Sequence, residues 1–145
     1  MAFLDEKYLL NGPTSEAIYA GIRDLPIIDA HNHCDVKALS EDRRFTDLWE
    51  AEGATDHYVW ECMRKCGVEE RFLTSNEVSN EEKWMAMAGA FELLVGNPTY
   101  EWIHLDLKRR LGINEEICAA NAKAIWDKGL AILNRPDMSQ QNLIR

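Results

Sequence analysis

Apolar residues recur at the three- and four-residue spacing of amphipathic helices through most of the second half of the chain. Ser79 and Glu82 have the spacing of a capping box, which opens one helix, and Gly96 ends it. Asn97 caps the next helix with a proline at the first helical position, and Gly112 closes that helix. These local signals predict a chain dominated by helices.

Weaker signals of the same kind predict further helices along the chain. Each combines a capping residue with a short apolar stripe and a residue that stops the helix. These helices are expected over 16–23 after a Thr14 or Ser15 cap, around 46–50, over 56–66 between Thr55 and Gly67, from an Asn114 cap to Asn134-Arg135-Pro136, and from Ser139 onward.

Residues 26–31 have instead the pattern of one short buried strand, which starts with proline and continues with two isoleucines. Because side chains alternate between the faces of a strand, Asp29, His31 and His33 are expected on one face. Two imidazoles two residues apart can converge on one metal ion, each with a nitrogen about 2.1 Å from it. A hydrated polar pair at a strand end is the alternative interpretation.

The other candidate ligands are expected to be structural. His104 lies on the apolar stripe of its helix, where a packed and hydrogen-bonded histidine is expected. None of the four cysteines forms a CxxC pair, and Cys62 and Cys66 share a helix face as packed thiols. This cysteine usage fits the reducing cytoplasm.

Composition narrows the function classes. The chain has 145 residues, of which 46% are hydrophobic, so it can bury a core and is not expected to be disordered. A net charge of −9 argues against nucleic acid as a partner. No apolar run approaches the roughly 20 residues that span a bilayer. The last predicted helix is still open at Arg145, which predicts a longer parent with a strand within about ten to fifteen further residues.

Four motifs, in this order, carry a family resemblance: LPIIDAHNHCD, TDHYVWECMRKCGVEE, GNPTYEWIHLDLKRRLGI and NAKAIW. Together they resemble the N-terminal third of the uronate (glucuronate) isomerases, which belong to the amidohydrolase superfamily of metal-dependent (β/α)8 barrels. The resemblance implies an N-terminal fragment of an α/β TIM barrel, mainly α as given. Residues 1–34 would form an arm, a short helix and the first barrel strand, and 35–145 a helical insertion in the same incomplete barrel domain.

The resemblance also implies an aldose–ketose isomerase that converts D-glucuronate to D-fructuronate and D-galacturonate to D-tagaturonate. His31 and His33 match the family's first-strand metal ligands, and His57 and Tyr58 match the pair that reaches the bound uronate. An N-terminal helical turn that only packs on the barrel is the structural alternative for His57 and Tyr58.

The family's remaining catalytic groups, including an aspartate ligand on the last strand, are expected beyond Arg145, so the fragment itself is expected to be inactive. The implied cofactor is a divalent metal, zinc first, and the resemblance leaves open whether the metal is essential and whether the chain forms a homo-oligomer. The partner would be a small uronate, without nucleic acid or membrane.

Two other functions remain as alternatives. One is a metal-dependent amidohydrolase that uses the same histidine pair to hydrolyse another substrate. The other is a non-catalytic helical module that retains a remnant of the pair. The DHY and NPTYEWIHL motifs argue against the hydrolase, because the superfamily's hydrolases need neither of them.

Overall fold

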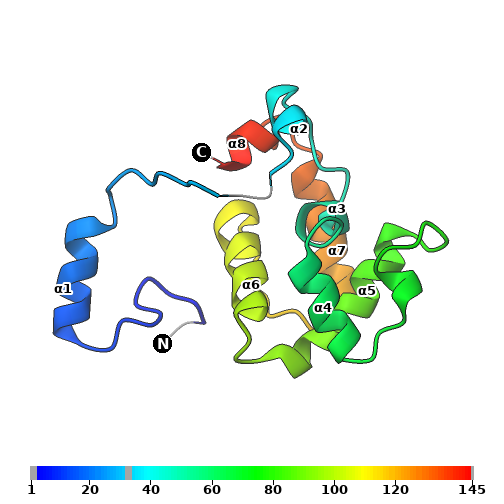
Figure 1. Cartoon of the computed structure of the whole chain (residues 1–145), viewed down its shortest axis with the longest axis horizontal. Coiled ribbons are helices and arrows are strands. Elements are labelled where there is room, and N and C mark those ends of the chain that lie inside the picture. The colour runs from blue at the N-terminus through cyan, green and yellow to red at the C-terminus, as the bar shows by residue number, and fades with distance from the viewer. Residues whose placement is uncertain (1–2, 32–33, 145) are drawn as a thin grey trace. The chain divides into compact units, whose positions relative to one another are not determined.

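A computed structural model of the chain describes residues 3–31 and 34–144. The chain divides into two compact units, Met1–Asp35 and Val36–Arg145. Every regular element among the described residues is helical (Figure 1). None of the helices in these two ranges is both long and apolar enough to cross a lipid bilayer.

The first unit holds one helix, α1 (Pro13–Ile22). It begins three residues earlier than predicted, because Pro13 suits the first helical position, where no backbone N–H is needed. Gly12 occupies the cap with a φ of 123°, a conformation that favours glycine. The predicted side-chain cap is wrong, since the Ser15 hydroxyl instead donates 2.9 Å to the Gly12 carbonyl.

The strand predicted over 26–31 is absent from the described residues of that segment, and this prediction is wrong for the chain as it stands. Ile27 and Ile28 are 92% and 93% exposed rather than buried. The physical reason is that a strand is stabilised by its ladder partner, and a parallel strand expects neighbours on both sides. The His31 backbone N–H donates to Asp29 Oδ1 over 3.0 Å, a contact between residues of the same irregular segment.

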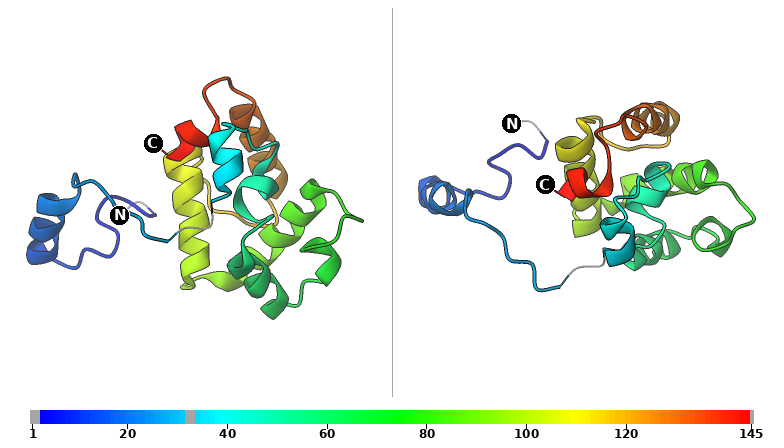
Figure 2. Two further views of the ribbon diagram at one scale, coloured as in Figure 1. Left: turned by 45° about the horizontal axis from the view of Figure 1, so that its top comes forward. Right: turned by 90° about the horizontal axis from the view of Figure 1, so that it is seen from above.

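The second unit is built around α5 (Asn80–Phe91), which packs against α3 (Leu48–Glu52) and α7 (Ala122–Leu133). These three helices lie together in both views of Figure 2. Trp84 of α5 is completely buried, and its indole N–H donates 2.9 Å to the Ala122 carbonyl at the start of α7. The largest fully buried side chains of this core are Trp49, Trp84, Phe91, Leu48, Met63, Leu73, Met87, Leu107, Ile113, Ile117, Ile125 and Leu133.

The remaining elements surround this core in pairs. Helix α4 (His57–Lys65) packs against α6 (Pro98–Leu111), and α6 also contacts α7. Helix α2 (Val36–Ser40) lies beside α8 (Gln140–Ile144), as the right-hand view of Figure 2 shows. Two 3-10 turns, η1 (Glu70–Phe72) and η2 (Glu92–Leu94), connect α4 to α5 and α5 to α6.

The capping signals read from the sequence are confirmed where they are local. Ser79 Oγ accepts from the Glu82 N–H, and Glu82 Oε2 accepts from the Ser79 N–H over 2.8 Å, which completes the capping box. Asn97 Oδ1 accepts from the Thr99 N–H over 2.9 Å. Gly112 ends α6 in the left-handed region, with a φ of 65°.

The helix predicted from Asn114 begins only at Ala122, and the segment between these residues is irregular. A tertiary contact explains the difference: the Ile117 N–H donates 2.8 Å to His104 Nε2. A backbone N–H used in this way is not available for an intrahelical bond. The Asn121 side chain then accepts from the Cys118 N–H over 2.9 Å and so holds the irregular segment closed.

Candidate functional site

The candidate substrate residues His57 and Tyr58 form the first turn of α4. Asp56, rather than the predicted Thr55, caps this helix, and its Oδ1 accepts from the Tyr58 N–H over 2.7 Å and from the Val59 N–H over 3.3 Å. Both candidate side chains are exposed. Because Asp56 already occupies two of the terminal N–H groups, a ligand anion at this turn would depend on the side chains of His57 and Tyr58.

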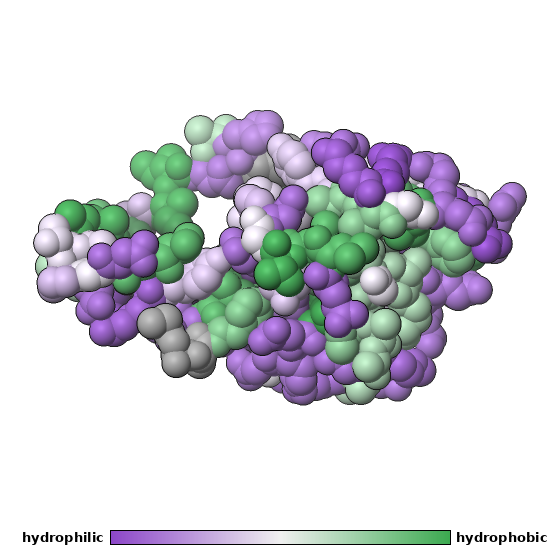
Figure 3. Space-filling model, turned by 90° about the horizontal axis from the view of Figure 1, so that it is seen from below, coloured by the Kyte–Doolittle hydropathy of each residue, from purple (hydrophilic) through white to green (hydrophobic). Residues whose placement is uncertain are grey.

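A row of three rings lies at the surface of the second unit. The ring centroids of His57 and Tyr58 are 4.2 Å apart, and those of Tyr58 and Trp102 are 6.1 Å apart with planes at 79°. Trp102 comes from α6 and is 54% exposed. Figure 3 shows one face of the molecule, on which hydrophobic residues reach the surface among hydrophilic ones. The sequence pattern missed Trp102 because it lies off the apolar stripe of α6.

A buried carboxyl lies close to the start of α4. Glu52 of α3 is only 7% exposed, and its side chain is hydrogen-bonded to Asp106 of α6. Burial, and secondly the charge of Asp106, raises the pKa of Glu52 well above its ordinary value of 4.5. Burial also raises the pKa of Asp106, but the hydrogen bond between the two side chains raises the pKa of Glu52 and lowers that of Asp106, so we assign the shared proton to Glu52 as the donor. No spacing in the sequence pointed to this pair, because its members come from helices far apart along the chain.

The Glu52 carboxyl makes stability depend on pH in a definite direction. The pKa of Glu52 is raised on folding. Its contribution to the free energy of unfolding is therefore fully present below pH 4.5 and is lost as pH rises through the folded-state pKa. Replacing Glu52 by glutamine, which stays neutral, is expected to raise the free energy of unfolding by about 1 kcal/mol at pH 8 and to change it little at pH 4.5. Urea unfolding of both proteins at the two pH values measures this difference.

The exposed Glu77→Gln change is the matched control for Glu52→Gln, because it makes the same substitution at an exposed position in the loop that precedes α5. Its effect is expected to be small at both pH values. An equal effect of Glu52→Gln at pH 4.5 and pH 8 would contradict the proton assignment.

The candidate metal ligands are only partly described. His31 is exposed in the irregular segment of the first unit, and His33 lies outside the described residues. Neutral imidazole is a suitable zinc ligand, but zinc sites take at least three protein ligands. Among the described residues, no group of three or more His, Cys, Asp or Glu side chains is placed to hold an ion. Any ion on His31 would thus need ligands from elsewhere.

The residues expected to be structural are confirmed as such. His104 is 3% exposed, its Nδ1 lies 2.6 Å from the Tyr100 carbonyl, and its Nε2 accepts from the Ile117 N–H. Burial lowers the pKa of His104, which is consistent with a neutral ring. Cys62 is buried and Cys66 is partly buried, and both are free thiols.

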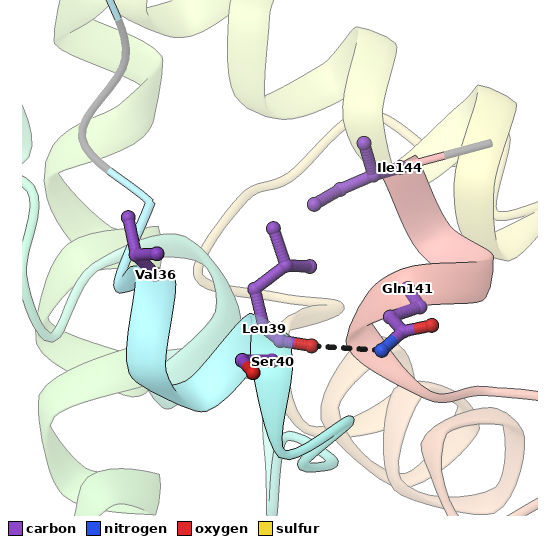
Figure 4. A pocket seen from close by; sticks show the side chains of 5 residues that line it. All are labelled: Val36, Leu39, Ser40, Gln141 and Ile144. Atoms are coloured by element: carbon purple, nitrogen blue, oxygen red, sulfur yellow. Dashed lines mark hydrogen bonds between the residues drawn. The ribbon is translucent and has the colours of Figure 1, made fainter.

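A groove of about 410 Å³ lies between α2 and α8 in the second unit. Figure 4 shows its lining and the hydrogen bond in which Gln141 Nε2 donates 3.0 Å to the Leu39 carbonyl. The lining contains no ionisable side chain, so the groove lacks groups for acid–base chemistry. It is lined by Val36, Leu39, Ser40, Gln141 and Ile144.

Comparison with known protein families shows to which family the chain belongs. The family model described as glucuronate isomerase matches residues 1–145. The chain belongs to the glucuronate isomerase family. This membership confirms the resemblance carried by the four sequence motifs.

Several relatives of this chain within the glucuronate isomerase family are named uronate isomerase. The one from Thermotoga maritima is 50% identical over 143 residues, which are 99% of this chain and 31% of the relative. The one from Clostridium acetobutylicum is 39% identical over 133 residues, which cover 91% of this chain and 28% of the relative. The chain therefore spans about a third of the length of the relatives it matches.

Two solved structures share the fold. The crystal structure of uronate isomerase from Thermotoga maritima matches with a TM-score of 0.89 and 48% identity, over 96% of this chain and 30% of that one. The crystal structure of glucuronate isomerase from Caulobacter crescentus matches with a TM-score of 0.81 and 27% identity, over 88% and 28% of the two chains. The chain therefore has the fold of the corresponding segment in these two isomerase structures.

Proposed function

We propose that this chain supplies the N-terminal part of a uronate isomerase, an aldose–ketose isomerase of sugar-acid breakdown in the cytoplasm. Its substrates would be D-glucuronate, converted to D-fructuronate, and D-galacturonate, converted to D-tagaturonate. The observation that carries the proposal is the family match over residues 1–145, together with a TM-score of 0.89 to a uronate isomerase structure. The exposed His57 and Tyr58 at the start of α4 support it, since they are accessible to a ligand.

The proposed fold of the parent is a (β/α)8 barrel, which typically needs about 250 residues. Residues 26–31 would become its first strand once a second strand pairs with them, and the helices of the second unit would form an insertion of the same domain. Burial of Ile27 and Ile28 by that barrel would remove the apolar surface that they now expose.

The isomerisation moves a proton between C1 and C2 of the open-chain sugar and needs a base, together with donors that hold the developing oxyanion. In this proposal His57 binds the uronate carboxylate, and the Tyr58 hydroxyl exchanges a hydrogen bond with a sugar hydroxyl. His31 and His33 would hold a divalent metal, with zinc as the first candidate. When bound, the metal would polarise a substrate oxygen. The base itself is expected outside this chain.

The test is a fusion of this 145-residue chain to the part of Thermotoga maritima uronate isomerase that follows its matched N-terminal segment. The fusion is expected to interconvert D-glucuronate and D-fructuronate, whereas each part alone is expected to be inactive. Replacing His57 by alanine should lower kcat/KM by about 10- to 100-fold, the cost of one hydrogen bond to a charged group.

Folding of the fusion is checked by circular dichroism and size-exclusion chromatography, so that misfolding is not mistaken for inactivity. A folded fusion without uronate turnover would contradict the proposed function. Amide or ester cleavage by that fusion would favour the hydrolase alternative, and no activity of any of these kinds would favour the helical module.

A further inference from the structure

Trp102 is more exposed than the other four tryptophans of the second unit. Trp49, Trp84 and Trp126 are each at most 4% exposed and Trp60 is partly buried, whereas Trp102 is 54% exposed. Large aromatic side chains contribute most when buried, so a half-exposed indole beside other exposed rings indicates a surface that meets a ligand.

The indole N–H of Trp102 is also available for a ligand. The indoles of Trp60 and Trp84 donate to the carbonyls of Gly53 and Ala122, over 2.7 and 2.9 Å. Among the hydrogen bonds of the described residues, none has the Trp102 side chain as its donor. When a ligand covers such a group, the group needs an acceptor, and sugar hydroxyl and carboxylate oxygens supply one.

The position of Trp102 relative to Tyr58 is fixed by the packing of two helices. Tyr58 lies in the first turn of α4 and Trp102 in the second turn of α6, and these helices contact each other. The two rings meet edge to face, a favourable arrangement for aromatic pairs. A ligand that contacts the exposed Tyr58 ring therefore also comes within reach of the indole, whose ring centroid lies 6.1 Å from that of Tyr58.

We infer that Trp102 is a third uronate-contacting residue, which donates its indole N–H to a sugar oxygen and presents its ring to sugar C–H groups beside Tyr58. This inference rests on the proposed function. It assigns part of the binding of the sugar to α6, whereas the candidates found in the sequence lie only on α4 and in the segment 26–33.

The active fusion described above is the protein for the test, with D-glucuronate as the probe. Trp102→Phe keeps a ring against Tyr58 but removes the N–H, and it is expected to raise KM about three- to tenfold while kcat changes less than about twofold. Trp102→Leu removes the ring contact as well and is expected to raise KM further. The exposed Leu93→Ala is the matched control, with KM unchanged.

A second measurement does not depend on turnover rates. Adding D-glucuronate is expected to change the tryptophan fluorescence of the fusion, and Trp102→Phe is expected to remove most of that change. If both Trp102 variants keep the parental KM, or if Trp102→Phe keeps the full fluorescence change, the inference is wrong even though the fusion is active. An inactive but folded parent fusion would overturn the proposed function, and this inference with it.

Discussion

Replacing Gly129 by alanine is expected to lower the free energy of unfolding of the chain by about 1 to 3 kcal/mol. Gly129 lies on the buried side of α7, where α3 packs against it. An added Cβ would lie 2.5 Å from Leu48 Cδ1 and 2.6 Å from Leu48 Cδ2, and Leu48 has no exposed surface into which it can move. Urea unfolding followed by circular dichroism measures the loss.

Gly89→Ala is the matched control for this change. Gly89 is also inside a helix, α5, but it is exposed, and an added Cβ would meet nothing within 4 Å. Alanine is the better helix former, so this change is expected to stabilise the chain by roughly 0.5 to 1 kcal/mol. Shortening Leu48 to alanine should make Gly129→Ala less costly than it is in the parent. Equal effects of the two glycine changes would show that α3 and α7 do not pack as described.

In the fusion with the Thermotoga maritima segment, His31→Ala is expected to weaken metal binding by more than about 100-fold. Loss of a group that only supports a metal ligand already costs about 10- to 100-fold, and removal of the ligand itself should cost more. Metal content after dialysis, measured by mass spectrometry, is the direct readout, and uronate turnover is expected to fall with it.

His57→Ala is the control for the metal prediction, since it should retain the metal while it weakens uronate binding. His31→Ala is thus expected to lower the metal content, whereas His57→Ala is expected to raise KM and leave the metal content unchanged. Unchanged metal content in His31→Ala would remove this histidine from the proposed ligand set, whatever the activity of the protein.

The parts of the fold that sequence reasoning found are those that depend on neighbours along the chain. The capping box of Ser79 and Glu82 and the left-handed Gly112 need only residues within one turn, so their signals are present in the sequence itself. The same holds for His57 and Tyr58, whose place in the first turn of α4 follows from the adjacent cap.

The parts that were missed depend on contacts between distant residues. The segment after Asn114 looks helical, but the bond from the Ile117 N–H to His104 keeps it irregular. The Glu52–Asp106 pair and the contact of Trp102 with Tyr58 each join two helices, and no periodicity encodes them. The strand over 26–31 lacks a partner among the described residues, so its pattern alone does not produce a ladder.

The environment of His104 has a consequence for acid tolerance. Its ring lies between the Tyr100 carbonyl, which accepts a hydrogen bond from the Nδ1–H group, and the Ile117 amide, which donates to Nε2. A second proton on the ring would set two N–H groups against each other, and burial already disfavours the cation. Acid is therefore expected to detach the 113–121 segment from α6, as pH falls below 6.5 and through the lowered pKa of His104.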